Sequence, residues 1–187
     1  MLKMRSFGRR KAGSRSPLGL ALPMAAVAGA VLTLLSPATA LANDDPHRTF
    51  LAAAPFDLPV GVCSFPVHLT FPVNNEYGTF STAADGSTVI KVTGAVVVTA
   101  TNKLTGATLT LDASGPAMLT FSPDGTTEQL DGRGLGLFFA ANGPQFGLPS
   151  NLVYTSGPLD ATIALATNSL TSLNNPHVLL DVCAALA

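Results

Sequence analysis

The feature that most constrains this chain is a two-residue alternation of apolar and polar side chains that begins near Leu58. Between residues 67 and 73 every second residue is apolar, while His68 and Thr70 fall on the opposite face. The same period recurs in the segments 90–98, 107–111 and 117–121. Alternation with a period of two is typical of a strand with one buried face. We therefore expect the chain to fold mainly as β-sheet.

Turn-forming sequences separate these segments, namely Ala84-Asp85-Gly86, Asn102–Gly106, Ser114-Gly115-Pro116 and Ser122–Gly125. Proline presets φ, and glycine accepts the left-handed conformation that ends a tight hairpin. Such regular punctuation predicts an all-β fold, either an antiparallel β-sandwich or a small β-barrel of about 8–10 strands. Later strands are expected over 126–140, 151–156, 161–167 and 177–183, with a loop over 141–149.

The N-terminal region has a different character. Residues 1–42 contain six basic and no acidic side chains, which gives this segment a net charge of +6. The remaining 145 residues contain four basic and eleven acidic side chains, which gives them a net charge of −7. An uncharged stretch from Leu18 to Leu35 precedes small residues that fit a cleavage pattern. This order predicts a cleavable signal peptide and a secreted, extracellular product, with cleavage after Ala42, or after Ala40 as the alternative. An uncleaved anchor is the competing interpretation, since about 18 apolar residues reach the lower limit for spanning a bilayer.

Three segments follow from these patterns. Residues 1–42 form the signal peptide, residues 43–57 a flexible leader without periodicity, and residues 58–187 a single β domain. We expect no membrane span after signal removal. Four scattered basic residues do not form the clustered positive surface that nucleic-acid binding requires, so no nucleic-acid partner is expected.

The two cysteines, Cys63 and Cys183, lie near the two ends of the β domain. Exported chains meet oxidising conditions, in which an isolated pair usually bonds. A catalytic thiol needs a neighbouring base, and zinc takes three or four ligands in close sequence pairs; neither pattern is visible. We predict a Cys63–Cys183 disulfide, which by closing a loop of 120 residues contributes roughly 5 kcal/mol in the chain-entropy model.

A glycine-rich segment holds the one candidate ligand or partner patch, formed by Gly132, Gly134, Gly136, Phe138 and Phe139. Its G-x-G-x-G spacing is not a dinucleotide fingerprint, because no helix start follows it. On one continuous strand the three glycines share a face, which predicts a bent strand or room for a neighbouring side chain. The functional alternative is the mouth of a cavity, with the adjacent phenylalanines, one on each strand face, marking an apolar patch.

No catalytic, cofactor-binding or metal site is assigned from the sequence. The histidines His47, His68 and His177 are dispersed along the sequence, and we expect them to be exposed and to share no role. Asp85, Asp124 and Asp131 each precede a glycine, as turn residues do. A site that the fold assembles from His68 or His177 with an acid stays open.

The ordered turns and the closing cysteine carry a resemblance to a known group. These residues are Asn102–Leu111, Ser114-Gly115-Pro116, Pro123–Thr126 and Asp181–Leu186. Over residues 60–187 the chain resembles a group of small secreted β-rich proteins from high-GC Gram-positive bacteria. The resemblance implies export and one domain, and it brings no activity or site residues.

Three functional hypotheses follow. The first is a secreted, non-catalytic β-domain that binds an extracellular or cell-envelope partner. The second is a β-barrel carrier of a small apolar ligand, based on the glycine face beside Phe138 and Phe139. The third is an enzyme whose site only the fold brings together.

Overall fold

The computed structural model describes residues 48–187, and nearly all of its regular structure is antiparallel β-sheet. The signal peptide, both cleavage positions, the first part of the leader and His47 lie outside the described residues. The described strands are β1 (Thr49–Phe50), β2 (Phe56–Asp57), β3 (Val67–Thr82), β4 (Thr88–Asn102), β5 (Thr108–Asp112), β6 (Ala117–Phe121), β7 (Thr127–Gly132), β8 (Gly136–Phe139), β9 (Leu152–Thr155), β10 (Leu159–Ala164), β11 (Ser169–Asn174) and β12 (Val178–Asp181). A 3-10 helix, η1 (Gly143–Phe146), and a short helix, α1 (Val182–Ala185), complete the order.

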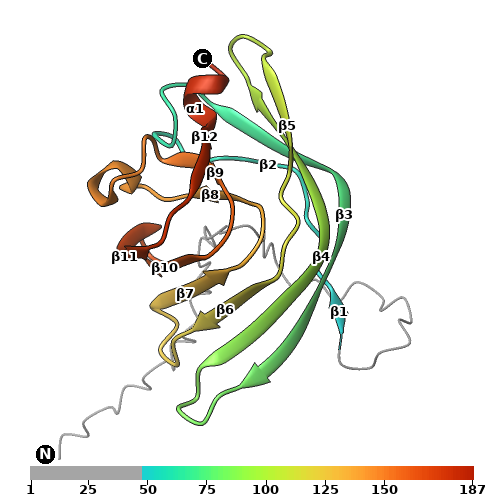
Figure 1. Cartoon of the computed structure of the whole chain (residues 1–187), viewed down its shortest axis with the longest axis vertical. Coiled ribbons are helices and arrows are strands. Elements are labelled where there is room, and N and C mark those ends of the chain that lie inside the picture. The colour runs from blue at the N-terminus through green and yellow to red at the C-terminus, as the bar shows by residue number, and fades with distance from the viewer. Residues whose placement is uncertain (1–47) are drawn as a thin grey trace, which may run out of the picture.

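The larger sheet is built around the two long strands β3 and β4. Its order is β1-β3-β4-β6-β7-β10-β11, with β2 also beside β3 and β5 also beside β4. Because β3 and β4 have 16 and 15 residues, each is long enough to pair with two shorter strands along one edge. The two long strands bend down one side of the molecule, and β6, β7, β10 and β11 lie below the smaller sheet in this view (Figure 1).

The smaller sheet has the order β12-β9-β8, and its strands β8 and β9 are buried on both faces. In β8, Leu137 and Phe139 belong to a first core with β3, β4 and the C-terminal helix, while Phe138 belongs to a second core with β6, β7 and β10. In β9, Leu152 and Val153 divide between the same two cores. The predicted all-β fold is therefore confirmed as a sandwich of two sheets, and the larger sheet does not close into a barrel.

The predicted turns are confirmed where glycine supplies a positive φ. Gly86 has a φ of 90° between β3 and β4, Gly106 one of 77° between β4 and β5, and Gly125 one of 68° between β6 and β7. The amide of Gly125 donates to the carbonyl of Ser122 at 2.9 Å, which closes that hairpin. An L-residue pays a steric penalty at such angles, so these positions favour glycine.

The expected alternation of β3 fails at its middle. The register with β4 shifts between Thr70 and Val73, which is the signature of a β-bulge. Leu69 is buried, but Val73 lies on the outer face and is exposed. The bulge adds one residue to β3, and every side chain beyond it changes face relative to the expected period. For the same reason Glu76 faces inward.

Three other expectations about the elements need correction. The single strand expected over 126–140 is two strands, β7 and β8, which belong to different sheets. Strand β11 was not expected, and the predicted last strand ends at Asp181, because α1 begins at Val182 with the Asp181 carboxylate accepting the Ala184 amide at 3.1 Å. Residues 48–57, expected in the flexible leader, carry β1 and β2 beside β3; main-chain pairing of two-residue strands requires no side-chain period.

Candidate functional site

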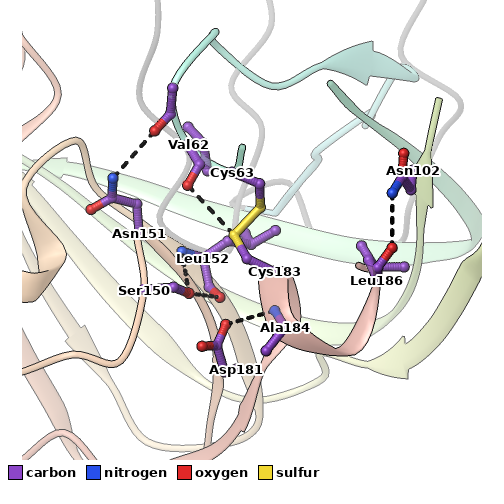
Figure 2. Close-up of a disulfide and its surroundings, with 11 residues drawn as sticks. Val62, Cys63, Asn102, Ser150, Asn151, Leu152, Asp181, Cys183, Ala184 and Leu186 are labelled. Atoms are coloured by element: carbon purple, nitrogen blue, oxygen red, sulfur yellow. Dashed lines mark hydrogen bonds between the residues drawn. A yellow bond between two sulfur atoms is a disulfide. The ribbon is translucent and has the colours of Figure 1, made fainter. Parts of the chain in front are cut away.

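The predicted disulfide is confirmed and joins the start of the β domain to α1. Cys63 and Cys183 are bonded across 120 residues, with their Cα atoms 5.5 Å apart. The Asn151 side-chain amide donates to the Gly61 carbonyl at 3.3 Å beside the bond, and the Asn102 amide donates to the Leu186 carbonyl at 2.8 Å on its other side (Figure 2). The last turn of the chain is thus held covalently and by a buried hydrogen bond.

The glycine-rich segment does not form one strand face. Gly132 ends β7, Gly134 lies in the connection, and Gly136 begins β8. Gly134 crosses the backbone at Gly115 so closely that a Cβ on Gly115 would lie 2.5 Å from the Gly134 Cα atom. Gly134 is thus required by a close approach of two backbones, and not by a bent strand or a neighbouring bulky side chain, which were the two structural expectations.

At Gly132 and Gly136 an added Cβ would instead lie in ordinary van der Waals contact with its neighbours. The nearest atoms to an added Cβ would be 3.9 Å away at Gly132 and 3.7 Å away at Gly136. All three glycines of the candidate patch line a pocket of about 50 Å³ between the two sheets. Val92, Leu130 and Leu159 supply apolar walls. The two phenylalanines are not surface groups: Phe138 and Phe139 are 1% and 2% exposed and belong to the two cores. Only Phe138 touches the pocket.

Glu76 is the residue of this pocket that the sequence analysis did not find. It lies on the inner face of β3, is 5% exposed and lines the pocket. Among the described residues its side chain has no hydrogen-bond or ion-pair partner. Burial raises the pKa of Glu76 to about 7, because desolvation disfavours the charged carboxylate.

Arg133 stands at the same pocket but is already paired. Its Nε atom is 2.6 Å from the Asp131 carboxylate, and one terminal nitrogen is 3.4 Å from Asp160. Asp131 raises the pKa of the guanidinium further. Neither aspartate lines the pocket, and both alternate along their strands with the inward-facing Leu130 and Leu159, so the guanidinium is held on the opposite face of the sheet and not beside Glu76.

Glu128 is a second buried carboxyl, placed outside this pocket. It shares the inner face of β7 with Leu130 and is 2% exposed. Desolvation raises its pKa to about 7 as well. No partner of its side chain is found within residues 48–187. Both glutamates are buried, but only Glu76 lines the pocket. Glu128 can therefore serve as the control residue in experiments on Glu76.

The described histidines do pair with other groups, although not with each other. His68 Nδ1 is 2.7 Å from Asp57, which also binds Lys103 at 2.7 Å, on the exposed outer face. These two partners lower the pKa of Asp57, the lysine most. His177 Nδ1 is 2.7 Å from the Ser156 hydroxyl. The fold therefore assembles one histidine–acid pair that the sequence analysis left open, and neither of its residues lines the Glu76 pocket.

A second group of interest lies on the outer face of the larger sheet. The Arg48 guanidinium stands 4.7 Å from the centre of the Tyr77 ring and donates to the Thr93 hydroxyl at 3.1 Å. Phe50 meets Tyr77 edge to face at 5.7 Å and leaves about half of its own surface exposed. We call Arg48, Phe50 and Tyr77 the Tyr77 cluster.

Within the described part of the chain, no three histidine, cysteine or acidic residues are grouped to hold a metal ion. No helix among residues 48–187 has the length and apolar character needed to cross a membrane. Comparison with protein-family models, curated proteins and solved structures gave no match. The interpretation of function therefore depends on the geometry of this chain alone.

Proposed function

We propose that this protein is a secreted, non-catalytic β-domain that binds an extracellular or cell-envelope partner through the Tyr77 cluster. The observation that carries the proposal is an exposed aromatic and arginine group held in a fixed arrangement. Tyrosine and arginine dominate the few residues that supply most of the energy of protein interfaces. Rigid aromatic rings lose little conformational entropy when they bind.

The arrangement is preorganised by its own contacts. Arg48 is fixed between the Tyr77 ring and the Thr93 hydroxyl, and Phe50 is fixed by pairing of β1 with β3 in register with Tyr77. A guanidinium over a tyrosine face is attracted by the ring quadrupole. The disulfide supports an oxidising location, in keeping with the expected signal peptide.

The pocket beside Gly132 supports the carrier of a small ligand as a second candidate. Its volume of about 50 Å³ is far below the roughly 300–1,000 Å³ of sites that enclose drug-sized ligands. A lipid-like or otherwise extended apolar molecule does not fit that space. For this reason partner binding is placed ahead of the carrier function.

A co-sedimentation experiment tests the proposal. The full chain is produced for export, purified from the medium, and mixed with washed cells and isolated envelopes of the producing organism. Phe50→Ala and Tyr77→Ala should each weaken binding, by about 30-fold where the truncated ring is a dominant contact. Leu104→Ala is the matched control, because Leu104 is an exposed apolar residue in the turn between β4 and β5.

Two outcomes would contradict the proposal. One is no saturable binding to cells or envelopes by the unaltered protein. The other is equal binding by all three variants, which would exclude the Tyr77 cluster as the binding surface. Arg48→Ala is an independent test of the Tyr77 cluster and should also weaken binding. Arg48 is exposed and belongs to neither core, so its replacement should leave the fold intact.

A further inference from the structure

We propose that the Glu76 pocket binds a compact organic cation, specifically a primary ammonium group on a short alkyl chain. This inference goes beyond the proposed function, because it concerns a site between the sheets and not the Tyr77 cluster on the outer face. It starts from a carboxyl that is almost wholly buried, lines a pocket, and has no partner among the described residues.

The charged residues that line the pocket favour a cationic ligand. A buried carboxylate is costly unless an opposite charge or hydrogen-bond donors compensate it. The other charged residue of the lining is Arg133, which is engaged by Asp131 and Asp160. Both aspartates alternate along their strands with the inward-facing Leu130 and Leu159, so they hold the guanidinium on the opposite face of the sheet. The Glu76 carboxylate therefore has no counter-charge in the pocket, and the site favours an added positive charge over an anion.

The apolar residues that line the pocket favour an alkyl chain on the ligand. Val92, Leu130 and Leu159 are apolar, and Gly132 and Gly136 contribute no side chain to the pocket. A bare metal ion would find one carboxylate here, whereas calcium takes six to eight oxygen ligands and magnesium six. An ammonium group carries three N–H donors, and the two Glu76 carboxylate oxygens can accept two of them, while its alkyl carbons fit against the apolar walls.

The volume limits the size of the ligand. One water needs roughly 10–15 Å³ of such space, so a pocket of about 50 Å³ accommodates about four non-hydrogen atoms. Ethylammonium and n-propylammonium meet this limit, and tetraethylammonium exceeds it. For so few atoms we expect a Kd near 1 mM or somewhat tighter.

Binding also moves a proton. Burial raises the pKa of Glu76 to about 7, and Arg133 stays charged throughout. Near pH 6 the carboxyl therefore holds a proton, which passes to the buffer when the ammonium ion binds. Near pH 8.5 no proton is released, and binding should be tighter than at pH 6 by about tenfold or more.

Titration calorimetry of the purified full chain tests the proposal, with n-propylammonium chloride as the probe and n-propanol as its neutral counterpart. We expect one saturable site for the cation at pH 8.5, no such site for the alcohol, and proton release at pH 6, detected in two buffers of different ionisation enthalpy. Tetraethylammonium should not bind. Saturable binding of the alcohol with equal affinity, or no cation binding at pH 8.5, would overturn the proposal.

The variants make the assignment specific. Glu76→Gln should abolish binding, whereas Glu128→Gln should retain it, because Glu128 is equally buried but does not line the pocket. Gly132→Val should weaken binding at least about tenfold by filling the space, with circular dichroism confirming the fold. Equal binding by Glu76→Gln would overturn the proposal. Phe50→Ala should leave cation binding unchanged, so failure of this site and failure of the envelope-binding proposal are distinguishable.

Discussion

The Asn102 side-chain amide donates a hydrogen bond of 2.8 Å to the carbonyl of Leu186, in a fully buried position beside the disulfide. The oxygen of the same side chain accepts the Leu104 amide at 2.8 Å and the Thr105 amide at 3.4 Å. One residue at the end of β4 therefore shapes the following turn and also anchors the C-terminal helix.

The first prediction concerns this residue. Asn102→Ala removes all three hydrogen bonds and leaves the buried Leu186 carbonyl without its partner. We expect a loss of about 2–3 kcal/mol in the free energy of unfolding, measured by urea denaturation. Asn174→Ala, at an exposed asparagine, should change it by less than about 0.5 kcal/mol. Equal effects of the two variants would contradict the anchoring role of Asn102.

The second prediction concerns the disulfide. Replacing Cys63 and Cys183 together by serine removes a constraint that spans 120 residues. The unfolded chain then gains conformational entropy, and we expect a loss of about 3–5 kcal/mol. Urea denaturation of the unaltered protein with and without reductant should give a similar difference. A change below about 1 kcal/mol in both experiments would show that the bond does not stabilise the fold.

The third prediction separates two glycines that lie two residues apart. Gly134→Ala should destabilise the protein by more than about 2 kcal/mol, because its Cβ would collide with the backbone at Gly115. Gly132→Ala should change stability by less than about 1 kcal/mol, since its Cβ finds no atom closer than 3.9 Å. Thermal unfolding of the two variants gives the comparison, and the reverse ranking would contradict the crossing of the two segments.

The fourth prediction is a fall in stability as the pH rises from about 4.5 to above 7. Burial raises the pKa values of Glu76 and Glu128 from 4.5 to about 7, so the folded state holds protons that the unfolded state releases in this range. Each glutamate should contribute a loss of about 3 kcal/mol across the window. Urea denaturation at several pH values should show the slope, and Glu128→Gln should reduce it by about half.

A change of the opposite sign is expected in acid. Hydrogen bonds within their turns lower the pKa values of Asp85, Asp112 and Asp124 below 3.8, so the stability they contribute is lost as the pH falls through that region. The protein should therefore be most stable between the two windows, near pH 4–5. Increasing stability between pH 5 and pH 8 would show that the two glutamates are not buried as carboxylic acids.

The parts of the fold that depend on local chemistry could be predicted from the sequence. Gly86 and Gly125 mark their hairpins because few other residues accept the required φ. The pairing of Cys63 with Cys183 could be predicted because the sequence contains no other cysteine. The position of Phe138 and Phe139 on opposite strand faces also followed from period two alone.

The remaining features depend on contacts between distant segments. Whether Phe138 and Phe139 are exposed or buried is decided by the larger sheet, which covers both faces of β8. The bulge after Thr70 turns Glu76 inward, against the period read from Val67 onward. The burial of Glu128 could have been suspected, because it lies two residues before Leu130 and so on the same face of the strand. One acidic residue in a short strand is, however, weak evidence of burial.

The covalent bond across residues 63–183 also orders the events of biogenesis. Synthesis from the N-terminus produces Cys63 long before Cys183, and β3 through β12 are made between them. The bond can therefore form only when almost all of the β domain has been synthesised. A chain truncated before Cys183 would keep Cys63 as an unpaired thiol.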